Sequence, residues 1–168
     1  MLTPLRDPDS VMKRIAACIV CLFALAAPVR AAEDVRLLAQ VPLVPPGEAT
    51  LPEDVLAFLY ALWPDYYNSV REGGFTRDNL RLGRIDLNGD GTSELVLMVD
   101  APGWEAAPGN PFVVAQWRKG RWLAVGWGWG DEDTVFATDD SVGGWLGIDG
   151  GKATMRWTGK EYHTEEKP

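Results

Sequence analysis

The sequence has little histidine and little cysteine, and both shortages limit its chemistry. His163 is the single histidine, and Cys18 and Cys21 are the two cysteines. Both cysteines lie in an N-terminal hydrophobic stretch that we expect to be removed, which would leave no thiol for a disulfide, a nucleophile or a metal. No G-x-S-x-G motif, phosphate-binding glycine loop or H-E-x-x-H motif is present. A catalytic triad and a zinc enzyme are therefore poorly supported.

The hydrophobic stretch has the pattern of a secretory signal peptide. A basic pair precedes an apolar run of 13 residues, 15–27, which is too short to cross a bilayer comfortably. Small residues then allow cleavage after Ala31. We predict a signal peptide over residues 1–31, with translation starting at Met12, and an exported protein that is periplasmic or secreted.

Cleavage would leave an acidic chain. It removes four of the 16 Lys and Arg residues and two of the 24 Asp and Glu residues, which leaves 12 and 22 and a net charge of −10. Such a chain repels phosphate backbones and anionic membrane surfaces. We therefore predict no nucleic-acid partner and no membrane association after cleavage, and we expect cations or basic partners to be favoured.

Proline and helical spacing divide the next part of the chain. Residues 32–49 contain the proline-rich run VPLVPPGE, which predicts a linker. Thr50 and Glu53 form a capping box ahead of apolar residues at helical spacing over 55–63. A second, weaker helix is predicted over 65–72, before a pair of glycines.

About six short strands are predicted after these one or two N-terminal helices. Their segments are LRLGRI, ELVLMV, FVVAQW, RWLAVGW, ATMRW and EYHT. Helices followed by strands joined through short turns are typical of an α+β fold with a mainly antiparallel sheet. We therefore predict a single α+β domain over residues 50–168.

Two of the strand pairs have a predictable register. The dipeptide KG at 119–120 indicates a two-residue turn, which places Trp117 opposite Trp122. A Gly-Lys turn between the last two strands places Trp157 opposite Tyr162 in the same way. The sequence thus predicts an aromatic cross-strand pair beside a tight turn twice.

The segment 86–97, DLNGDGTSELVL, gathers oxygen-bearing side chains just before an apolar run. They occupy positions 1, 3, 5 and 9 of the loop, and a glycine that permits a sharp turn occupies position 6. Without a cation, three carboxylates this close would repel one another. Calcium takes about 6–8 oxygen ligands. We predict a Ca²⁺ site formed by the side chains of Asp86, Asn88, Asp90 and Glu94 and the carbonyl of Thr92; the alternative is a solvated Asn-Gly/Asp-Gly turn.

The pattern D-x-N-x-D-G-x-x-E with a strand immediately after it resembles the calcium loops of FG-GAP and integrin-type β-propeller repeats. The resemblance implies a structural ion with these side-chain ligands: Asp86, Asn88, Asp90 and Glu94. An EF-hand is disfavoured because position 12 is Leu97 and because a strand follows the loop. Propellers repeat the motif, whereas this chain has one copy, so the resemblance covers the loop and not the fold.

Two further groups of residues are candidates for binding. The run GWGWG places Trp127 and Trp129 on one face of a strand, as a ligand platform that could stack on sugar rings, although such aromatics more often fill a core. The run GDEDTVFATDD could supply a second cation site, a surface for a basic partner or an acid pair for glycoside hydrolysis. A solvated loop is its simplest interpretation. Its acids are Asp131, Glu132, Asp133, Asp139 and Asp140.

Together these patterns predict a small exported calcium-binding domain, more readily a non-enzymatic binding protein than an enzyme, with an unknown protein or glycan partner. One alternative is a carbohydrate-binding module that uses Trp127 and Trp129. The other is a hydrolase that uses a carboxylate pair among Asp131, Asp133, Asp139 and Asp140.

Overall fold

Most of the chain folds as β-strands in the computed structural model, which describes residues 35–47, 51–52, 55–63, 76–106 and 109–167. The elements are β1 (Leu37–Gln40), α2 (Val55–Leu62), the 3₁₀ helix η1 (Arg77–Asn79), β2 (Leu80–Ile85), β3 (Glu94–Val99), β4 (Asn110–Arg118), β5 (Arg121–Gly130), β6 (Phe136–Val142), β7 (Trp145–Asp149), β8 (Ala153–Trp157) and β9 (Tyr162–Glu166). The predicted signal peptide, the capping residues Thr50 and Glu53 and the second helix at 65–72 lie outside the described residues. No helix among the described residues is long and apolar enough to span a membrane.

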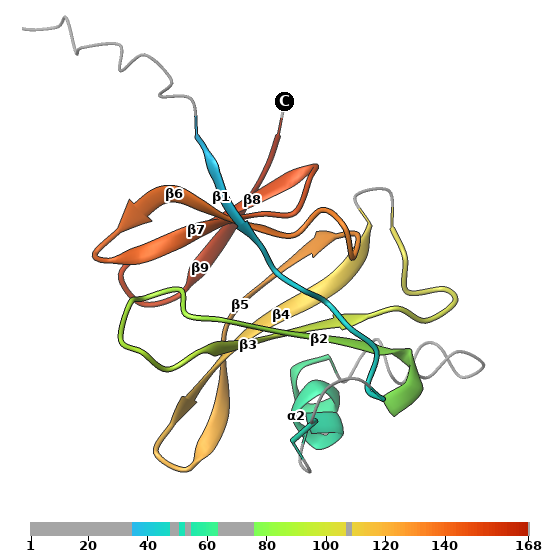
Figure 1. Ribbon diagram of the computed structural model, residues 1–168. Coiled ribbons are helices and arrows are strands. Elements are labelled where there is room, and N and C mark those ends of the chain that lie inside the picture. The colour runs from blue at the N-terminus through green and yellow to red at the C-terminus, as the bar shows by residue number, and fades with distance from the viewer. Residues whose placement is uncertain (1–34, 48–50, 53–54, 64–75, 107–108, 168) are drawn as a thin grey trace, which may run out of the picture. The chain divides into compact units, whose positions relative to one another are not determined.

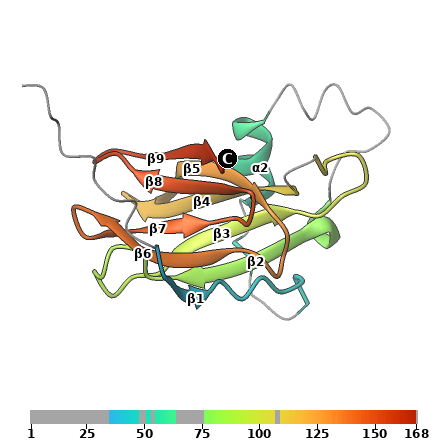
Figure 2. The same ribbon diagram turned by 90° about the horizontal axis from the view of Figure 1, so that it is seen from above.

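The strands form two antiparallel sheets. One has five strands in the order β1-β6-β7-β8-β9, and the other has four in the order β2-β3-β4-β5. Figure 1 and Figure 2 show the two sheets as stacked layers, and β5 of the second sheet lies against β8 and β9 of the first. The predicted α+β class is wrong, because the described residues contain nine strands and one α-helix of eight residues.

Successive side chains of β3 alternate between two buried faces of the four-stranded sheet. Every residue of β3 is buried. Val96 and Met98 point into the core between the sheets, whereas Leu95 and Leu97 point to the opposite face, where α2 packs. The second sheet is therefore buried on both faces along β3, and α2 covers part of its outer face (Figure 1).

Both predicted hairpin registers are confirmed. Trp117 pairs with Trp122 across β4 and β5, and Trp157 pairs with Tyr162 across β8 and β9. Lys119 and Gly120 have φ angles of 52° and 79°. Positive φ at both turn residues is typical of the type I′ turn that matches the twist of the flanking strands.

Three strands were not predicted: β1, β6 and β7. Strand β1 lies within the range predicted as a linker, and Val41 and Leu43 just after it are buried in the core between the sheets. Strand β6 includes Asp139 and Asp140, which the sequence pattern placed in a loop. Together with β7, these segments build most of the five-stranded sheet, and their omission explains why the sandwich was missed.

Candidate functional site

The predicted calcium loop connects β2 to β3 and forms a closed turn. Ile85 and Glu94 are paired in the antiparallel register, so the ends of the 86–93 segment lie side by side. Gly91, at the sixth loop position, has a φ of 82°, a value that a residue with a Cβ rarely adopts. The glycine pattern therefore bends the loop as the sequence predicts.

Side-chain oxygens of the loop accept hydrogen bonds from its own backbone. Asp86 Oδ1 accepts from the Gly89 N–H (2.8 Å), and Asp86 Oδ2 accepts from the Gly91 N–H (2.9 Å). Asn88 Oδ1 accepts from the Asp90 N–H (2.9 Å), and Asp90 Oδ1 accepts from the Thr92 N–H (2.7 Å). The Gly91 N–H in particular holds the pKa of Asp86 below its usual value.

Glu94 is the buried member of the set. Glu94 is only 1% exposed. Oε2 accepts from the Leu87 N–H (2.9 Å), and Oε1 accepts from Asn88 Nδ2 (3.2 Å). Burial raises the pKa of Glu94, the Leu87 N–H partly offsets this, and the charges of Asp90 and Asp86 raise it further. Ionised Glu94 is therefore in a site that disfavours its negative charge.

The structure brings the predicted ligands into one loop but does not focus their carboxylates on one point. Within the described part of the chain, no three His, Cys, Asp or Glu side chains are arranged so that they could hold a metal ion. The oxygens of Asp86 and Asp90 are aimed at backbone N–H groups instead. The calcium site stays a prediction.

Leu87 anchors the loop to the other sheet, a role that no sequence pattern indicated. Its side chain is fully buried between the sheets. Its carbonyl accepts from the Leu146 N–H of β7 (2.8 Å), and the Leu146 carbonyl accepts from the Tyr162 hydroxyl of β9 (2.7 Å). The charge of Glu94 adds to the burial that raises the pKa of Tyr162. The loop is thus bonded to both layers of the sandwich.

The glycines and the tryptophans of the run GWGWG lie on opposite faces of β5. A Cβ at Gly126 would collide with Tyr162, and one at Gly128 would lie 2.8 Å from Met155 Sδ, so the glycines let the five-stranded sheet approach closely. Trp127 and Trp129 occupy the opposite face. Trp127 is 46% exposed, and its ring lies 5.8 Å from that of Trp129 at an interplanar angle of 70°.

These two tryptophans line an apolar groove with two others that sequence reasoning missed. Trp63, just after α2, lies edge-on to Trp127 with ring centroids 6.5 Å apart, and it lies 6.0 Å from Trp104. The groove encloses about 450 Å³, including its open mouth. No pattern could have joined these residues, because they follow α2 and β3 and meet only in the fold. Its lining residues are Leu62, Trp63, Trp104, Pro111, Trp127 and Trp129.

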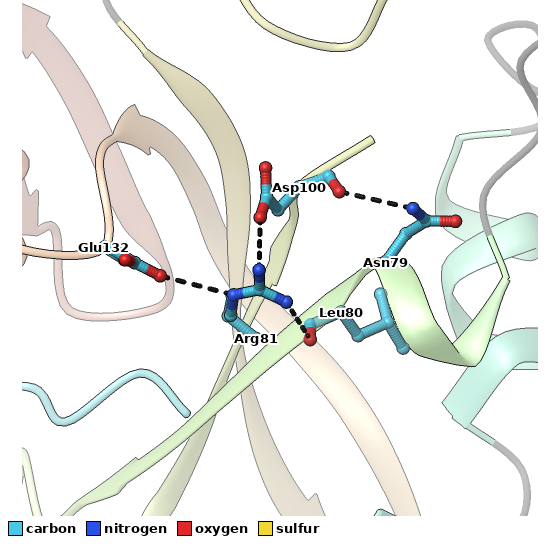
Figure 3. Close-up of polar contacts among 5 residues, drawn as sticks. All are labelled: Asn79, Leu80, Arg81, Asp100 and Glu132. Atoms are coloured by element: carbon cyan, nitrogen blue, oxygen red, sulfur yellow. Dashed lines mark hydrogen bonds and ion pairs between the residues drawn. The ribbon is translucent and has the colours of Figure 1, made fainter. Parts of the chain in front are cut away.

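Three of the five acids predicted at 131–140 have structural partners. Figure 3 shows Arg81, whose Nε lies 3.2 Å from Glu132 Oε2 and whose Nη2 lies 2.6 Å from Asp100 Oδ2. Asp140 pairs with Arg156 at 2.7 Å, and Asp139 Oδ1 accepts from the Arg36 N–H at 2.8 Å. Asp131 and Asp133 are exposed, and none of these acids lines the groove. These contacts link Glu132 to β2, Asp140 to β8 and Asp139 to the backbone just before β1.

Comparison with known proteins adds no family to this description: no family model, no curated protein and no solved structure matches the chain.

Proposed function

We propose that the protein is a small exported, non-enzymatic binding domain whose 86–94 loop binds a structural Ca²⁺ ion. The observation that carries this proposal is the state of Glu94, a buried carboxylate with a raised pKa beside the charges of Asp86 and Asp90. A divalent cation among these groups would remove the repulsion and lower the pKa of Glu94. The signal-peptide pattern of residues 1–31 supports export, where calcium is plentiful.

The hydrogen bonds of the loop are compatible with an ion. An ionised carboxylate offers about four lone-pair sites, so Asp86 can keep its backbone bonds and still donate electron pairs to a metal. Oxygen-rich ligation by carboxylates, an amide and a backbone carbonyl suits the hard Ca²⁺ ion.

The expected effect of the ion is on stability, because the loop is tied to both sheets through Leu87. A ligand that binds only the folded state stabilises it by about 2.7 kcal/mol at a concentration of about 100 times Kd. For a domain of this size that corresponds to an increase in melting temperature of about 5–10 °C. Thermal unfolding of the mature chain with and without saturating Ca²⁺ measures it.

Asp90→Asn is the matched variant for this experiment. Asparagine can still accept the Thr92 N–H bond that Asp90 Oδ1 makes in the loop, but it removes one negative charge from the site. We expect the variant to fold and to lose most of the calcium response. Magnesium, which demands tighter octahedral geometry and releases water reluctantly, should stabilise the wild type less. An unchanged melting temperature of the wild type in calcium would overturn the proposal.

A second candidate function, carbohydrate binding, is favoured by the exposure of Trp127 beside the apolar groove. Indole faces can stack on the C–H faces of pyranose rings, and the groove offers Trp127 and Trp129 from one strand. Affinity electrophoresis in gels that contain neutral polysaccharides tests this candidate. We expect retardation that Trp127→Ala abolishes, whereas equal mobility in all gels would exclude it.

A further inference from the structure

The free end of the β4–β5 hairpin carries an exposed aromatic pair with a cation beside it. Trp117 is 48% exposed, and its ring centroid lies 5.3 Å from that of its cross-strand partner Trp122, at an interplanar angle of 66°. The guanidinium carbon of Arg84, on β2, lies 5.7 Å from the Trp122 ring centroid. Trp122 also packs against the core on the α2 side of the sheet. The indoles therefore lie on a firm sheet rather than on a loop.

The same end of the hairpin concentrates positive charge in a chain whose formal net charge is −8. Arg118 is directly opposite Arg121, and Lys119 stands at the turn between them. Arg118 Nε donates to the neutral Gln116 Oε1. Among the described residues, the ion pairs involve other cations, and no Asp or Glu pairs with these three or with Arg84. Like charges opposite one another destabilise a hairpin, so an anion bound here would relieve repulsion.

We infer that this surface binds an acidic polysaccharide. We call it the basic platform, formed by Arg84, Trp117, Arg118, Lys119, Arg121 and Trp122. An indole face matches the C–H face of a pyranose ring, and a guanidinium matches a carboxylate or sulfate through paired, charge-assisted hydrogen bonds. Trp117, Trp122 and Arg84 share the α2 face of the sheet, where the exposed indoles and one guanidinium lie close together. Lys119 is at the turn, and Arg118 and Arg121, whose side chains alternate to the other face of the hairpin, add positive charge at the same end. The inference depends neither on the calcium loop nor on the apolar groove.

The overall charge favours a narrow polyanion over a broad one. An anionic bilayer or a nucleic-acid duplex would bring much of an acidic protein into a negative field, and it would be repelled. A single polysaccharide chain needs to contact only the basic platform, and charges farther away than about 8 Å are largely screened at physiological salt. The predicted export also places the protein where polysaccharides, rather than nucleic acids, are the common polyanions.

Binding of an oligogalacturonate to the full mature chain tests the inference, with its methyl-esterified form as the neutral ligand of the same ring structure. Calorimetry in low salt should detect the charged oligomer and a weaker interaction, or none, with the ester. The double variant Arg84→Gln/Lys119→Gln should weaken binding of the charged form about tenfold or more, the effect expected for losing charge-assisted hydrogen bonds. Trp117→Ala should weaken binding of the charged form, and of the ester to the extent that the ester binds. A sulfated oligosaccharide of equal length distinguishes carboxylate from sulfate as the preferred group.

The matched control is Arg77→Gln/Lys160→Gln, which removes two exposed positive charges outside the basic platform. It should bind as the wild type does, and thermal unfolding confirms that all variants are folded. Equal loss in this control would show an effect of net charge and would overturn the inference. Tighter binding to anionic vesicles or to single-stranded oligodeoxythymidylate than to either oligosaccharide would overturn it as well. Calcium response and retardation in neutral gels are measured separately, so failure here leaves the proposed functions untouched.

Discussion

The acidic loop at 86–94 and the basic turn at 118–121 each concentrate charges of one sign, but they differ in how many hydrogen-bond partners those charged side chains have within the protein. Both connect neighbouring strands of the four-stranded sheet, and in an antiparallel meander the two connections lie at the same end. Within the loop, backbone N–H groups donate hydrogen bonds that stabilise the carboxylates of Asp86 and Asp90. The turn offers its cations only one neutral side-chain acceptor among the described residues, Gln116.

The difference follows from the chemistry of the chain itself. A tight turn presents several free N–H groups toward its interior, and short Asp and Asn side chains can reach them. Long Arg and Lys side chains carry their charge away from the backbone and into water. An acidic turn can therefore be organised before its ligand arrives, whereas a basic turn depends on an external anion. This contrast predicts that a cation binds to an acidic loop that is already formed. It also predicts that a polyanion binds to the basic turn by relieving the repulsion among its cations.

The largest expected effect comes from the apolar anchor of the acidic loop. Leu87→Ala empties a fully buried position between the sheets, and such truncations cost about 2–5 kcal/mol. Urea unfolding should show this loss, and it should exceed the effect of any single charge change in the loop or the turn. Leu38→Ala, at an exposed position of β1, is the control and should change stability by less than about 0.5 kcal/mol. A small effect of Leu87→Ala would mean that the loop is not tied to the sandwich core.

The second-largest expected effect is a dependence of the free energy of unfolding on pH that is due to Glu94. Because the folded pKa of Glu94 is raised, its ionisation disfavours the fold, so its contribution is present at low pH and is lost as the pH rises through the folded pKa. Glu94→Gln should remove this loss, so that in calcium-free solution the variant gains stability relative to the wild type as the pH rises. Calcium should eliminate that difference or reverse it. Urea unfolding across the acidic to neutral range measures both curves; parallel curves would contradict the account.

The smallest expected effects are two changes in stability of opposite sign, one for removing a charge from the basic turn and one for removing a charge from the acidic loop. Arg121→Gln removes one of two opposed cations and should stabilise the ligand-free protein by about 0.2–0.5 kcal/mol. Asp86→Asn should destabilise it, because backbone N–H groups hold the pKa of Asp86 low and favour its ionised form. Opposite signs in urea unfolding would sharpen the contrast between loop and turn. Destabilisation by both substitutions would erase it.

Local patterns predicted what depends on neighbouring residues. The turn at 119–120 sets the register of Trp117 and Trp122, and the helix over 55–62 follows apolar residues at helical spacing. The glycines of the acidic loop likewise produce the predicted turn. In each case the information lies within about ten residues of chain.

Contacts between distant segments could not be predicted in this way. Strand β6 carries adjacent Asp139 and Asp140, which spoil the usual alternation of a strand, and their partners come from Arg36 and Arg156. The sandwich therefore escaped detection. The groove could not be predicted for the same reason, because Trp63 comes to lie beside Trp104 and Trp127 only when α2 packs on the sheet. A shared oxygen focus for calcium is also a property of side-chain rotamers that spacing alone cannot determine.

Calorimetric titration of the mature chain with Ca²⁺, in parallel with Glu94→Gln, tests directly whether the 86–94 loop binds calcium through Glu94. We expect one ion per chain, proton release on binding that increases as the pH is lowered, because Glu94 must be ionised to ligate the ion, and no comparable binding by the variant. Glu94→Gln that binds calcium as the wild type does, or a wild type that binds none, would contradict it.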